Sequence, residues 1–348
     1  MQSPNSGGAR GDSGRRHVPV DEFDAIAGLR EQFEAVARLR APGGRIPPVG
    51  ETWIGDDAAV VGVPSGGRMV LATDLVVEGV HVDLSLSSAE DVGYKVLMVT
   101  VSDLAAMGVR PTHALVSIAG PAGTDLPGLG DGLAVAAGEA GCVVVGGDLA
   151  EAPVVVVSTV VVGSSDPAGA PPLLRSGARP GDRLFTTGPL GRSAAGLRLL
   201  RAAPGPPRPA AAPALIRAHR RPVARLAEGE TARRSGATAA IDVSDGLVAD
   251  LVHLAEASGV GVDLDDVPVA EGATLGEALG GGEEYELVVA TGSPDDLLAA
   301  FRAAGTAAPR VVHRPAGGAH PGWRAAAPGG MASHVLRKPT GSSVTMGG

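Results

Sequence analysis

Lysine is almost absent from this chain, although arginine is common. Among 29 basic residues only Lys95 and Lys338 are lysines, and 38 acidic residues bring the formal net charge to −9. Proteins that bind the phosphate backbone of nucleic acids carry a basic patch or stripe on one face. No such stripe runs through this acidic sequence, so we expect no nucleic-acid partner.

Cysteine and long apolar segments are equally scarce. The single cysteine, Cys142, excludes a disulfide within the chain. The longest apolar run, 154–162, contains a serine and a threonine, and it is far shorter than the roughly 20 residues that span a bilayer. The N-terminal segment is polar and lacks the apolar stretch of a secretory signal. We therefore expect a cytoplasmic protein with no membrane partner.

Glycine and proline, in contrast, are abundant, with 52 and 28 residues, and aromatic residues make up only 2% of the chain. Such a composition can indicate disorder, but 44% of the residues are hydrophobic and occur in regular stretches, which predicts a globular protein. The polar residues 1–20 are predicted to form a disordered arm, and 336–348 a disordered tail. The length favours two domains, with a junction in the segment 164–183, which is rich in glycine and proline.

In the N-terminal part of the chain, the hydrophobic pattern alternates between helical and strand periodicity, which predicts a mixed α/β domain. A helix is predicted to begin at the N-cap Ser88, with Asp91 completing a capping box, and to stop at Gly108. The other elements follow from hydrophobic periodicity. We predict helices over 22–40 and 126–140 and strands over 58–63, 69–72, 76–82, 113–119, 142–145 and 154–162.

The C-terminal part shows a similar mixture of elements. The segment 202–213 is predicted to be an exposed insertion with little regular structure. We predict strands over 239–243 and 285–290 and helices over 247–257 and 295–304.

Aspartates recur at the edges of apolar elements. A buried carboxylate without a partner costs several kcal/mol, on the order of an unpaired ion, and only Lys95 among the lysines lies near any of these positions. Divalent cations supply the missing charge, and Mg²⁺ prefers oxygen ligands that it shares with phosphates. The pattern therefore favours magnesium–phosphate chemistry. The aspartates are Asp56, Asp57, Asp74, Asp103, Asp148, Asp242 and Asp245.

Taken singly, each position also has a structural interpretation. Asp245 opens a helix and is a candidate cap, and Asp56–Asp57 is typical of a turn. The glycines before Asp148 suit either a phosphate site or a tight turn. Familiar nucleotide signatures such as GxxxxGK[ST] are missing.

Seven short motifs follow one another between residues 22 and 300. They are IGDD at 54–57, ATDLVVEGVHV at 72–82, TVSDLAAMG at 100–108, GGD at 146–148, RSGARPGD at 175–182, IDVSDGL at 241–247 and GGEEYEL at 281–287. In this order they resemble the pattern of the thiamine-monophosphate kinase family, part of the aminoimidazole-ribonucleotide-synthetase-like (PurM-like) superfamily.

The resemblance implies an α/β (α+β), PurM-like two-domain fold. The N-terminal domain, 21–165, would bind ATP and Mg²⁺ and pair across a homodimer into a barrel-like sheet, and the C-terminal domain, 166–335, would be α+β. The implied activity is transfer of the γ-phosphoryl of the co-substrate ATP to thiamine monophosphate, the last step of thiamine diphosphate biosynthesis. We expect direct in-line transfer without a phospho-enzyme, because the acceptor is already an oxyanion.

Site residues follow from the same motif matches. Catalysis is assigned to Asp57, Asp74, Asp103 and Asp148, and the carboxylates are expected to hold metal. The implied metal ligands are Asp57, Thr73, Asp74, Asp103, Asp148, Asp242 and Asp245; the ATP contacts are Gly147, Asp148, Arg175 and Ser244; the thiamine-phosphate contacts are His81 and Glu283. The C-terminal aromatic motif of the family is not clearly matched, and Trp323 is the candidate there for a ring that stacks on the thiamine.

Two departures from the family pattern keep other functions open. Ala72 stands where the family often has serine or threonine, and Glu284 replaces an aspartate. They motivate a non-catalytic nucleotide- or thiamine-phosphate-binding homologue as an alternative. Another PurM-like ATP-dependent enzyme is a second alternative, against which VEGVH and GGEEYE argue. Selenophosphate synthesis needs a reactive N-terminal cysteine, and Cys142 lies in an apolar segment instead.

Overall fold

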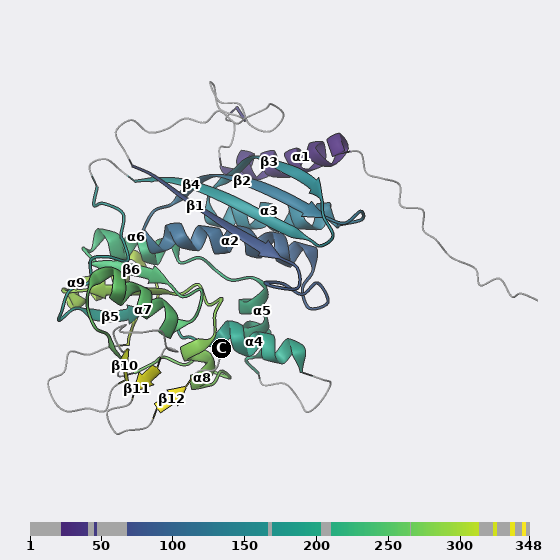
Figure 1. The fold of residues 1–348 in the computed structure, drawn as a ribbon. Coiled ribbons are helices and arrows are strands. Elements are labelled where there is room, and N and C mark those ends of the chain that lie inside the picture. Colours follow the sequence, from purple (N-terminus) through teal and green to yellow (C-terminus); the bar gives the residue numbers. More distant parts are fainter. Residues whose placement is uncertain are drawn as a thin grey trace, which may run out of the picture.

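The computed structural model describes residues 22–40, 45–46, 68–165, 169–202, 210–264 and 266–312, together with the backbone of 323–325, 335–337 and 343–345. The described elements form an N-terminal half and a C-terminal half, which Figure 1 shows one above the other. No helix in these ranges has the length and apolar character needed to cross a membrane.

A four-stranded sheet with helices on one face makes up the N-terminal half. The strand order is β1-β4-β2-β3, with β2 and β3 parallel and the other pairs antiparallel. Helices α1, α2 and α3 pack against this sheet. The elements are α1 (Glu22–Arg40), β1 (Arg68–Val77), α2 (Ala89–Ala106), β2 (Pro111–Gly120), α3 (Leu126–Ala140), β3 (Val143–Glu151) and β4 (Val156–Ser165).

Strand β1 shows how the two faces of this sheet differ. Val70 and Val76 are buried beneath the helices, whereas Leu71 and Leu75 are 60% and 50% exposed on the other face. Alternate residues of a strand point to opposite faces, so Asp74 shares the helix-covered face with Val70 and Val76. The opposite face is called the open face below.

Helix α2 is capped as the sequence predicts. The Ser88 hydroxyl accepts a hydrogen bond from the Asp91 backbone N–H at 3.1 Å, and the Asp91 carboxylate accepts one from the Ser88 N–H at 3.4 Å. The helix ends where Gly108 adopts φ +67°. Its residues are buried from Asp91 to Ala106 with the exception of Asp103, so this apolar helix passes through the middle of the molecule.

The C-terminal half contains a second sheet, in which all strand pairs are antiparallel, and the remaining described helices. The strand order is β6-β8-β5-β9, and a third sheet has the order β12-β11-β10-β7. The elements are β5 (Arg183–Thr186), α4 (Arg192–Arg201), α5 (Ala212–Arg220), α6 (Leu226–Arg234), β6 (Ala239–Asp242), α7 (Leu247–Ser258), β7 (Asp263–Leu264), α8 (Leu275–Gly280), β8 (Leu287–Thr291), α9 (Pro294–Ala304), β9 (Arg310–Val311), β10 (Trp323–Ala325), β11 (Val335–Arg337) and β12 (Ser343–Thr345).

The two halves share one hydrophobic core through α2. This helix packs on β1, β4 and α3 on one side and on α6, β6 and α5 on the other. Phe185 and Phe301 of the C-terminal half belong to the same cluster of buried residues as Leu97, Leu104 and the lone thiol Cys142. The contact between α2 and α6 is close, because a Cβ on Gly229 would lie 1.9 Å from the carbonyl oxygen of Ala105.

Three local predictions need correction. The segments 69–72 and 76–82 are not two strands: β1 continues through Thr73 and Asp74 because both pair with β4. After Val77 the chain forms a turn, in which the Val77 carbonyl accepts the backbone N–H groups of residues 80–82. The GGD motif is not a turn but part of β3, paired with β2. Glycine at 147 lets the strands approach closely, because a Cβ there would lie 1.8 Å from the Val116 oxygen.

The other predicted elements agree with the structure where it describes them, whereas β5 and the helices α4, α5, α6 and α8 had no predicted counterpart. The helices over 22–40 and 126–140 are confirmed with the same bounds. The predicted strand 58–63, the arm 1–20 and most of the insertion 202–213 lie outside the described residues. The tail predicted as disordered overlaps β11 and includes β12, whose pairing with β11 was invisible in the local pattern. The domain limits stay predictions.

Candidate active site

A cavity of about 840 Å³ opens between the two halves. Its walls come from β1 and the turn after it, from α2, from helices α4 and α5, and from the loops that precede α7 and β8. The polar lining residues that matter below are Asp74, His81, Lys95, Arg201, His219, Ser244, Asp245, Glu283 and Tyr285.

The turn after β1 places His81 at the cavity. The His81 Nδ1 accepts a hydrogen bond from the Val77 backbone N–H at 3.1 Å, which orients the ring from within its own turn. Gly79 allows this turn by adopting φ +80°. His81 is exposed to the cavity and lies close enough to Asp74 for its charge to lower the pKa of that carboxyl, against the larger effect of burial.

Asp74, Asp103 and Asp242 form an acidic cluster beside the cavity. Burial, with smaller contributions from the charges of Asp242 and Asp74, raises the pKa of Asp103 to about 7, while Arg175 opposes the rise. Burial also raises the pKa values of Asp74 and Asp242. These carboxyls come from β1, α2 and β6, and their mutual repulsion has no lysine to offset it.

The Ser102 hydroxyl orients one member of this cluster. It donates a hydrogen bond of 2.7 Å to Asp242 Oδ2, and both side chains are buried. Ser102 and Asp103 belong to the C-terminal half of α2, so the helix contributes one carboxylate to the cluster and aligns another. This contact also ties the N-terminal half of the molecule to β6 of the C-terminal half.

The first turn of α7 brings a further carboxylate, which the sequence analysis missed. Asp250 Oδ2 accepts hydrogen bonds from the backbone N–H groups of Asp245 at 3.2 Å and Gly246 at 3.1 Å, in the loop before the helix. Burial, with smaller contributions from the charges of Asp242 and Asp245, raises the pKa of Asp250 to about 7. An acidic residue in the first turn of a helix that follows SDG was the available signal.

The loop before β8 holds Glu283 in an unusual backbone conformation. Glu283 and Tyr285 have φ values of +61° and +53° and are the non-glycine residues with positive φ in the described chain. Such conformations are rare for side chains of this size and cluster at functional sites. Backbone hydrogen bonds from Glu283 to Ser244 and from Tyr285 to Val243 hold the loop against the β6–α7 connection.

Glu283 is the centre of a second polar group that sequence reasoning missed. Its Oε1 lies 2.6 Å from the Lys95 ammonium, and its Oε2 lies 3.4 Å from His219 Nδ1. Burial, together with the positive charge of Lys95, lowers the pKa of His219 to about 4, so the ring is neutral near pH 7. A single lysine inside an otherwise apolar helix was the sequence signal that pointed to this pair.

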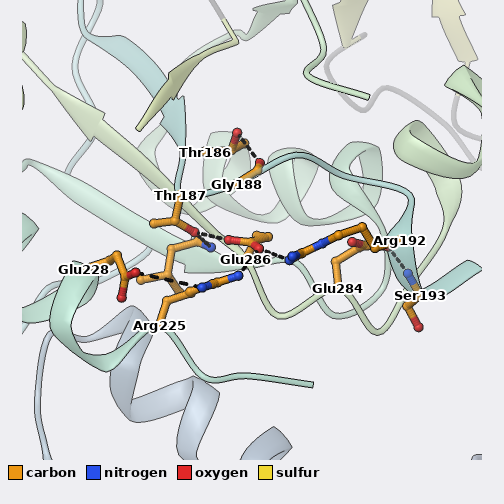
Figure 2. A network of polar contacts seen from close by, with 10 residues as sticks. Thr186, Thr187, Gly188, Arg192, Ser193, Arg225, Glu228, Glu284 and Glu286 are labelled. Atoms are coloured by element: carbon orange, nitrogen blue, oxygen red, sulfur yellow. Dashed lines mark hydrogen bonds and ion pairs between the residues drawn. The ribbon is translucent and has the colours of Figure 1, made fainter. Parts of the chain in front are cut away.

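A buried ion network lies directly behind the loop, and Figure 2 shows it. Glu286 is fully buried and pairs with the guanidinium groups of Arg192 and Arg225, and it accepts a 2.5 Å hydrogen bond from the Thr187 hydroxyl. Glu284 Oε1 accepts the Ser193 backbone N–H at 2.8 Å. The network therefore connects the strained loop to the start of α4 and to α6.

The predicted site residues separate into two groups. Asp74, His81, Ser244, Asp245 and Glu283 line the cavity. Asp103, Asp242 and Arg175 lie within electrostatic reach of each other and of Asp74. These eight residues come from five of the seven motifs, so the fold brings distant parts of the sequence to one place.

The remaining predicted residues lie elsewhere. Thr73 occupies the open face by strand alternation, and its hydroxyl donates to the Thr159 carbonyl at 3.0 Å. Gly147 and Asp148 lie in β3, which β4 and β2 separate from β1, so Asp148 is about 14 Å from Asp74 across three strand spacings. Trp323 begins β10 and pairs with Leu264 through its backbone, and Asp57 lies outside the described residues.

The chemistry of the acidic cluster suits a hard divalent cation. Its donors are carboxylate oxygens, which Mg²⁺ prefers, and burial, more than repulsion among them, raises their pKa values. Within the described ranges no three aspartate, glutamate, histidine or cysteine side chains converge closely enough to form a complete metal site. Asp57, a predicted ligand, is not among these residues.

Comparison with known families gives two adjacent matches. Residues 55–165 match the model of the AIR synthase related protein N-terminal domain, and residues 179–312 match that of the AIR synthase related protein C-terminal domain. The thiamine-monophosphate kinase of Mycobacterium tuberculosis is 38% identical over 329 residues, which cover 86% of this chain and 90% of the relative.

Solved structures give the same picture. The crystal structure of thiamine-monophosphate kinase from Stenotrophomonas maltophilia aligns with a TM-score of 0.70 at 28% identity, covering 82% of this chain and 92% of that one. A structure described as AaThiL complexed with AMPPCP and TMP aligns with a TM-score of 0.61 at 29% identity, covering 87% and 96%. The two-domain PurM-like architecture predicted from the sequence is thereby confirmed.

Proposed function

This chain belongs to the thiamine-monophosphate kinase family of AIR synthase related proteins, and from that premise we propose that it phosphorylates thiamine monophosphate with ATP. The products are thiamine diphosphate and ADP. The observation that carries the proposal is the cavity between the two halves, which gathers Asp74, His81, Ser244 and Glu283 from three separate motifs.

Both substrates have support from the relatives. The AaThiL structure holds AMPPCP, a non-hydrolysable analogue of ATP, together with TMP. A cavity of about 840 Å³ falls within the range of small-molecule sites, about 300–1,000 Å³. We assign ATP contacts to Arg175, Ser244, Gly147 and Asp148, and contacts with the thiamine substrate to His81, Glu283 and Trp323.

Magnesium is part of the proposal because the acidic cluster fits it. Asp74, Asp103 and Asp242, with Asp57 and Asp245, would hold the ions, and Thr73 and Asp148 are the further candidates. Bound Mg²⁺ would neutralise charge on the phosphate oxygens and orient them. Burial, with a smaller contribution from neighbouring carboxylates, raises the pKa values of Asp74, Asp103 and Asp242, and a bound cation would favour their ionised forms.

The residues of the chain contribute positioning more than covalent chemistry. Phosphoryl transfer needs donor and acceptor oxygens in line and their charge stabilised. The acceptor is a phosphate oxyanion, so no strong general base is required, and we infer direct transfer with no phospho-enzyme. The Arg175 guanidinium would pair with a nucleotide phosphate, and Glu283 would fix the organic part of the acceptor.

A homodimer is the assembly we propose. The open face exposes Met69, Leu71, Leu75 and Leu115 at 47%, 60%, 50% and 41%, and apolar side chains gathered on one sheet face mark an interaction surface. Two such faces packed together would form the barrel-like sheet expected from the sequence. The cytoplasmic location stays a prediction.

The direct test is an activity assay on the purified full chain. With ATP, Mg²⁺ and thiamine monophosphate, we expect thiamine diphosphate and ADP in equal amounts, followed by chromatography. Tight binding of both ligands without product would identify a non-catalytic homologue. Product from free thiamine in place of the monophosphate would show that the acceptor had been misassigned.

Asp103→Asn tests the acidic cluster within the same assay. We expect kcat to fall by at least about a hundredfold, because a preorganised charge at the reacting phosphates is lost. The melting temperature should not fall, because the substitution removes a repelled buried carboxylate. Asp296→Asn, at an exposed position of α9, is the matched control. Near-normal turnover by Asp103→Asn would remove this residue from the site.

A further inference from the structure

Lys95 stands out among the residues around the cavity. It is the one lysine in the part of the chain that the structure describes, and it is only 2% exposed within α2. Burying an ammonium is unfavourable unless a partner compensates it. The partner is Glu283 at 2.6 Å, whose side chain is 28% exposed at the cavity. The carboxylate is therefore the more exposed member of this pair at the cavity, and the ammonium is almost fully covered.

Glu283 needs such support because its backbone is strained. Its φ of +61° is a conformation that costs about 1–3 kcal/mol for a residue other than glycine and persists only where surrounding contacts enforce it. The described contacts of the carboxylate are Lys95 and His219. His219 is buried and neutral near pH 7, so Lys95 provides the charge that fixes the side chain.

Helix α2 also relates this pair to the acidic cluster. Lys95, Val99 and Asp103 follow one another at intervals of four residues, which places them along one side of the helix. With a rise of 1.5 Å per residue, Lys95 and Asp103 are separated by about 12 Å along the axis. Lys95 and Val99 line the cavity. Asp103 belongs to the acidic cluster, where the proposed function places the reacting phosphates.

We propose that Lys95 is the positioning residue for the substrate-binding carboxylate of Glu283. Its ion pair fixes the Glu283 side chain in the strained loop, so that the carboxylate faces the cavity and receives the cationic organic part of the acceptor. The acceptor then extends along α2 with its phosphate toward Asp103. This inference rests on the proposed function and adds a residue and an orientation to it.

The test is a double-mutant cycle on the full-length enzyme with Lys95→Met, Glu283→Gln and the double variant. We expect Lys95→Met to raise the KM for thiamine monophosphate at least about tenfold, the effect of losing a charged hydrogen bond. The KM for ATP should stay within about twofold of wild type. In the Glu283→Gln background, Lys95→Met should add less than about twofold, because its effect passes through Glu283.

Two further variants distinguish the loss of Glu283 positioning from a general weakening of the contact between the two halves. Lys95→Arg keeps the charge and should recover most of the affinity for thiamine monophosphate. Arg110→Met removes another ion pair between the halves, Arg110–Glu230 at 2.8 Å, outside the cavity lining, and should leave both KM values unchanged. An equal KM increase in Arg110→Met would overturn the proposal.

Other outcomes overturn it as well. An unchanged or lower KM in Lys95→Met would mean that the ammonium does not position Glu283. Additive effects in the double variant would mean that Lys95 contacts the substrate directly. If Lys95→Met does not fold, Lys95→Arg and the charge-free double variant still allow the comparison. Absence of kinase activity in the wild type would refute the proposed function, and calorimetric binding of thiamine monophosphate to the same variants would still decide the role of Lys95.

Discussion

At the scale of single residues, only one of the two carboxylate oxygens of Glu284 has a hydrogen-bond partner. Oε1 accepts the Ser193 N–H, whereas the buried Oε2 has no hydrogen-bond partner among the described atoms. Burial raises the pKa of Glu284 from 4.5 to about 7, although Ser193 and Arg192 oppose the rise. The family pattern has an aspartate here, so the extra methylene carries this carboxylate to its place beside α4.

The pH dependence of stability follows from that shift. A raised pKa means that the folded state binds the proton more tightly than the unfolded state does. The contribution of Glu284 to the free energy of unfolding is therefore fully present below pH 4.5 and is lost as the pH rises through about 7. The shift corresponds to about 3 kcal/mol. Glu284→Gln should therefore gain stability relative to wild type between pH 5 and pH 8, as measured by chemical unfolding. A stability difference between Glu284→Gln and wild type that does not change with pH would contradict this prediction. Glu256→Gln, on the exposed side of α7, is the control.

At the residue scale, the motifs predicted which side chains would gather, whereas contacts outside the motifs were not predicted. Asp74, His81 and Glu283 carry recognisable sequence contexts, and the fold brings them to one cavity. Their roles stay predictions. Lys95 lies outside the motifs, and its partner Glu283 comes from a segment far away in the chain, a kind of pair that leaves no periodic trace in the sequence. Asp250 accepts hydrogen bonds from the backbone of the nearby Asp245 and Gly246, and these depend on the path of the β6–α7 loop.

At the scale of elements, α2 shows which features local sequence determines. Its capping box and its terminating glycine lie within a few residues of the ends that they define, so both were predictable. The extent of β1 was not, because Thr73 and Asp74 interrupt the apolar pattern and the strand continues only through its pairing with β4. The same reason explains the GGD motif, whose extended form depends on β2.

The crossing of α2 and α6 gives a prediction at this scale. A Cβ at position 229 would lie 1.9 Å from the Ala105 carbonyl, so Gly229→Ala must push the two helices apart. We expect a loss of about 1–3 kcal/mol in the free energy of unfolding, as for other overpacked cores. Denaturant unfolding measures it. Gly138→Ala is the helical control, since its Cβ would meet Val36 at an ordinary 3.5 Å, and equal stability of the two variants would contradict the close packing.

At the scale of the whole molecule, apolar side chains gather on the open face of the sheet. Met69, Leu71 and Leu115 are 47%, 60% and 41% exposed there and do not line the cavity, whereas Leu75, near the end of β1, lines it. An apolar face in contact with water is unfavourable by about 25 cal/mol for each Å². Covering this face with the proposed partner subunit would therefore stabilise the assembly.

Leu71→Lys tests the assembly. A charge placed on the 60% exposed Leu71 would be buried in the proposed dimer, so we expect dissociation to monomers by light scattering. Leu275→Lys introduces the same charge at a 48% exposed leucine of α8, away from the sheet, and should leave the mass unchanged. A wild-type protein that is monomeric at micromolar concentration would refute the homodimer.

The accessibility of the buried Cys142 can report on the opening of the shared core. As the lone thiol, it lies at 0% exposure in the cluster that joins both halves. A thiol reagent can modify it only when that core opens, so labelling kinetics measure the opening of the interior without an introduced probe. Ligands that bind in the cavity and stabilise the closed core should slow the labelling of Cys142. The labelling rate would then measure substrate binding quantitatively.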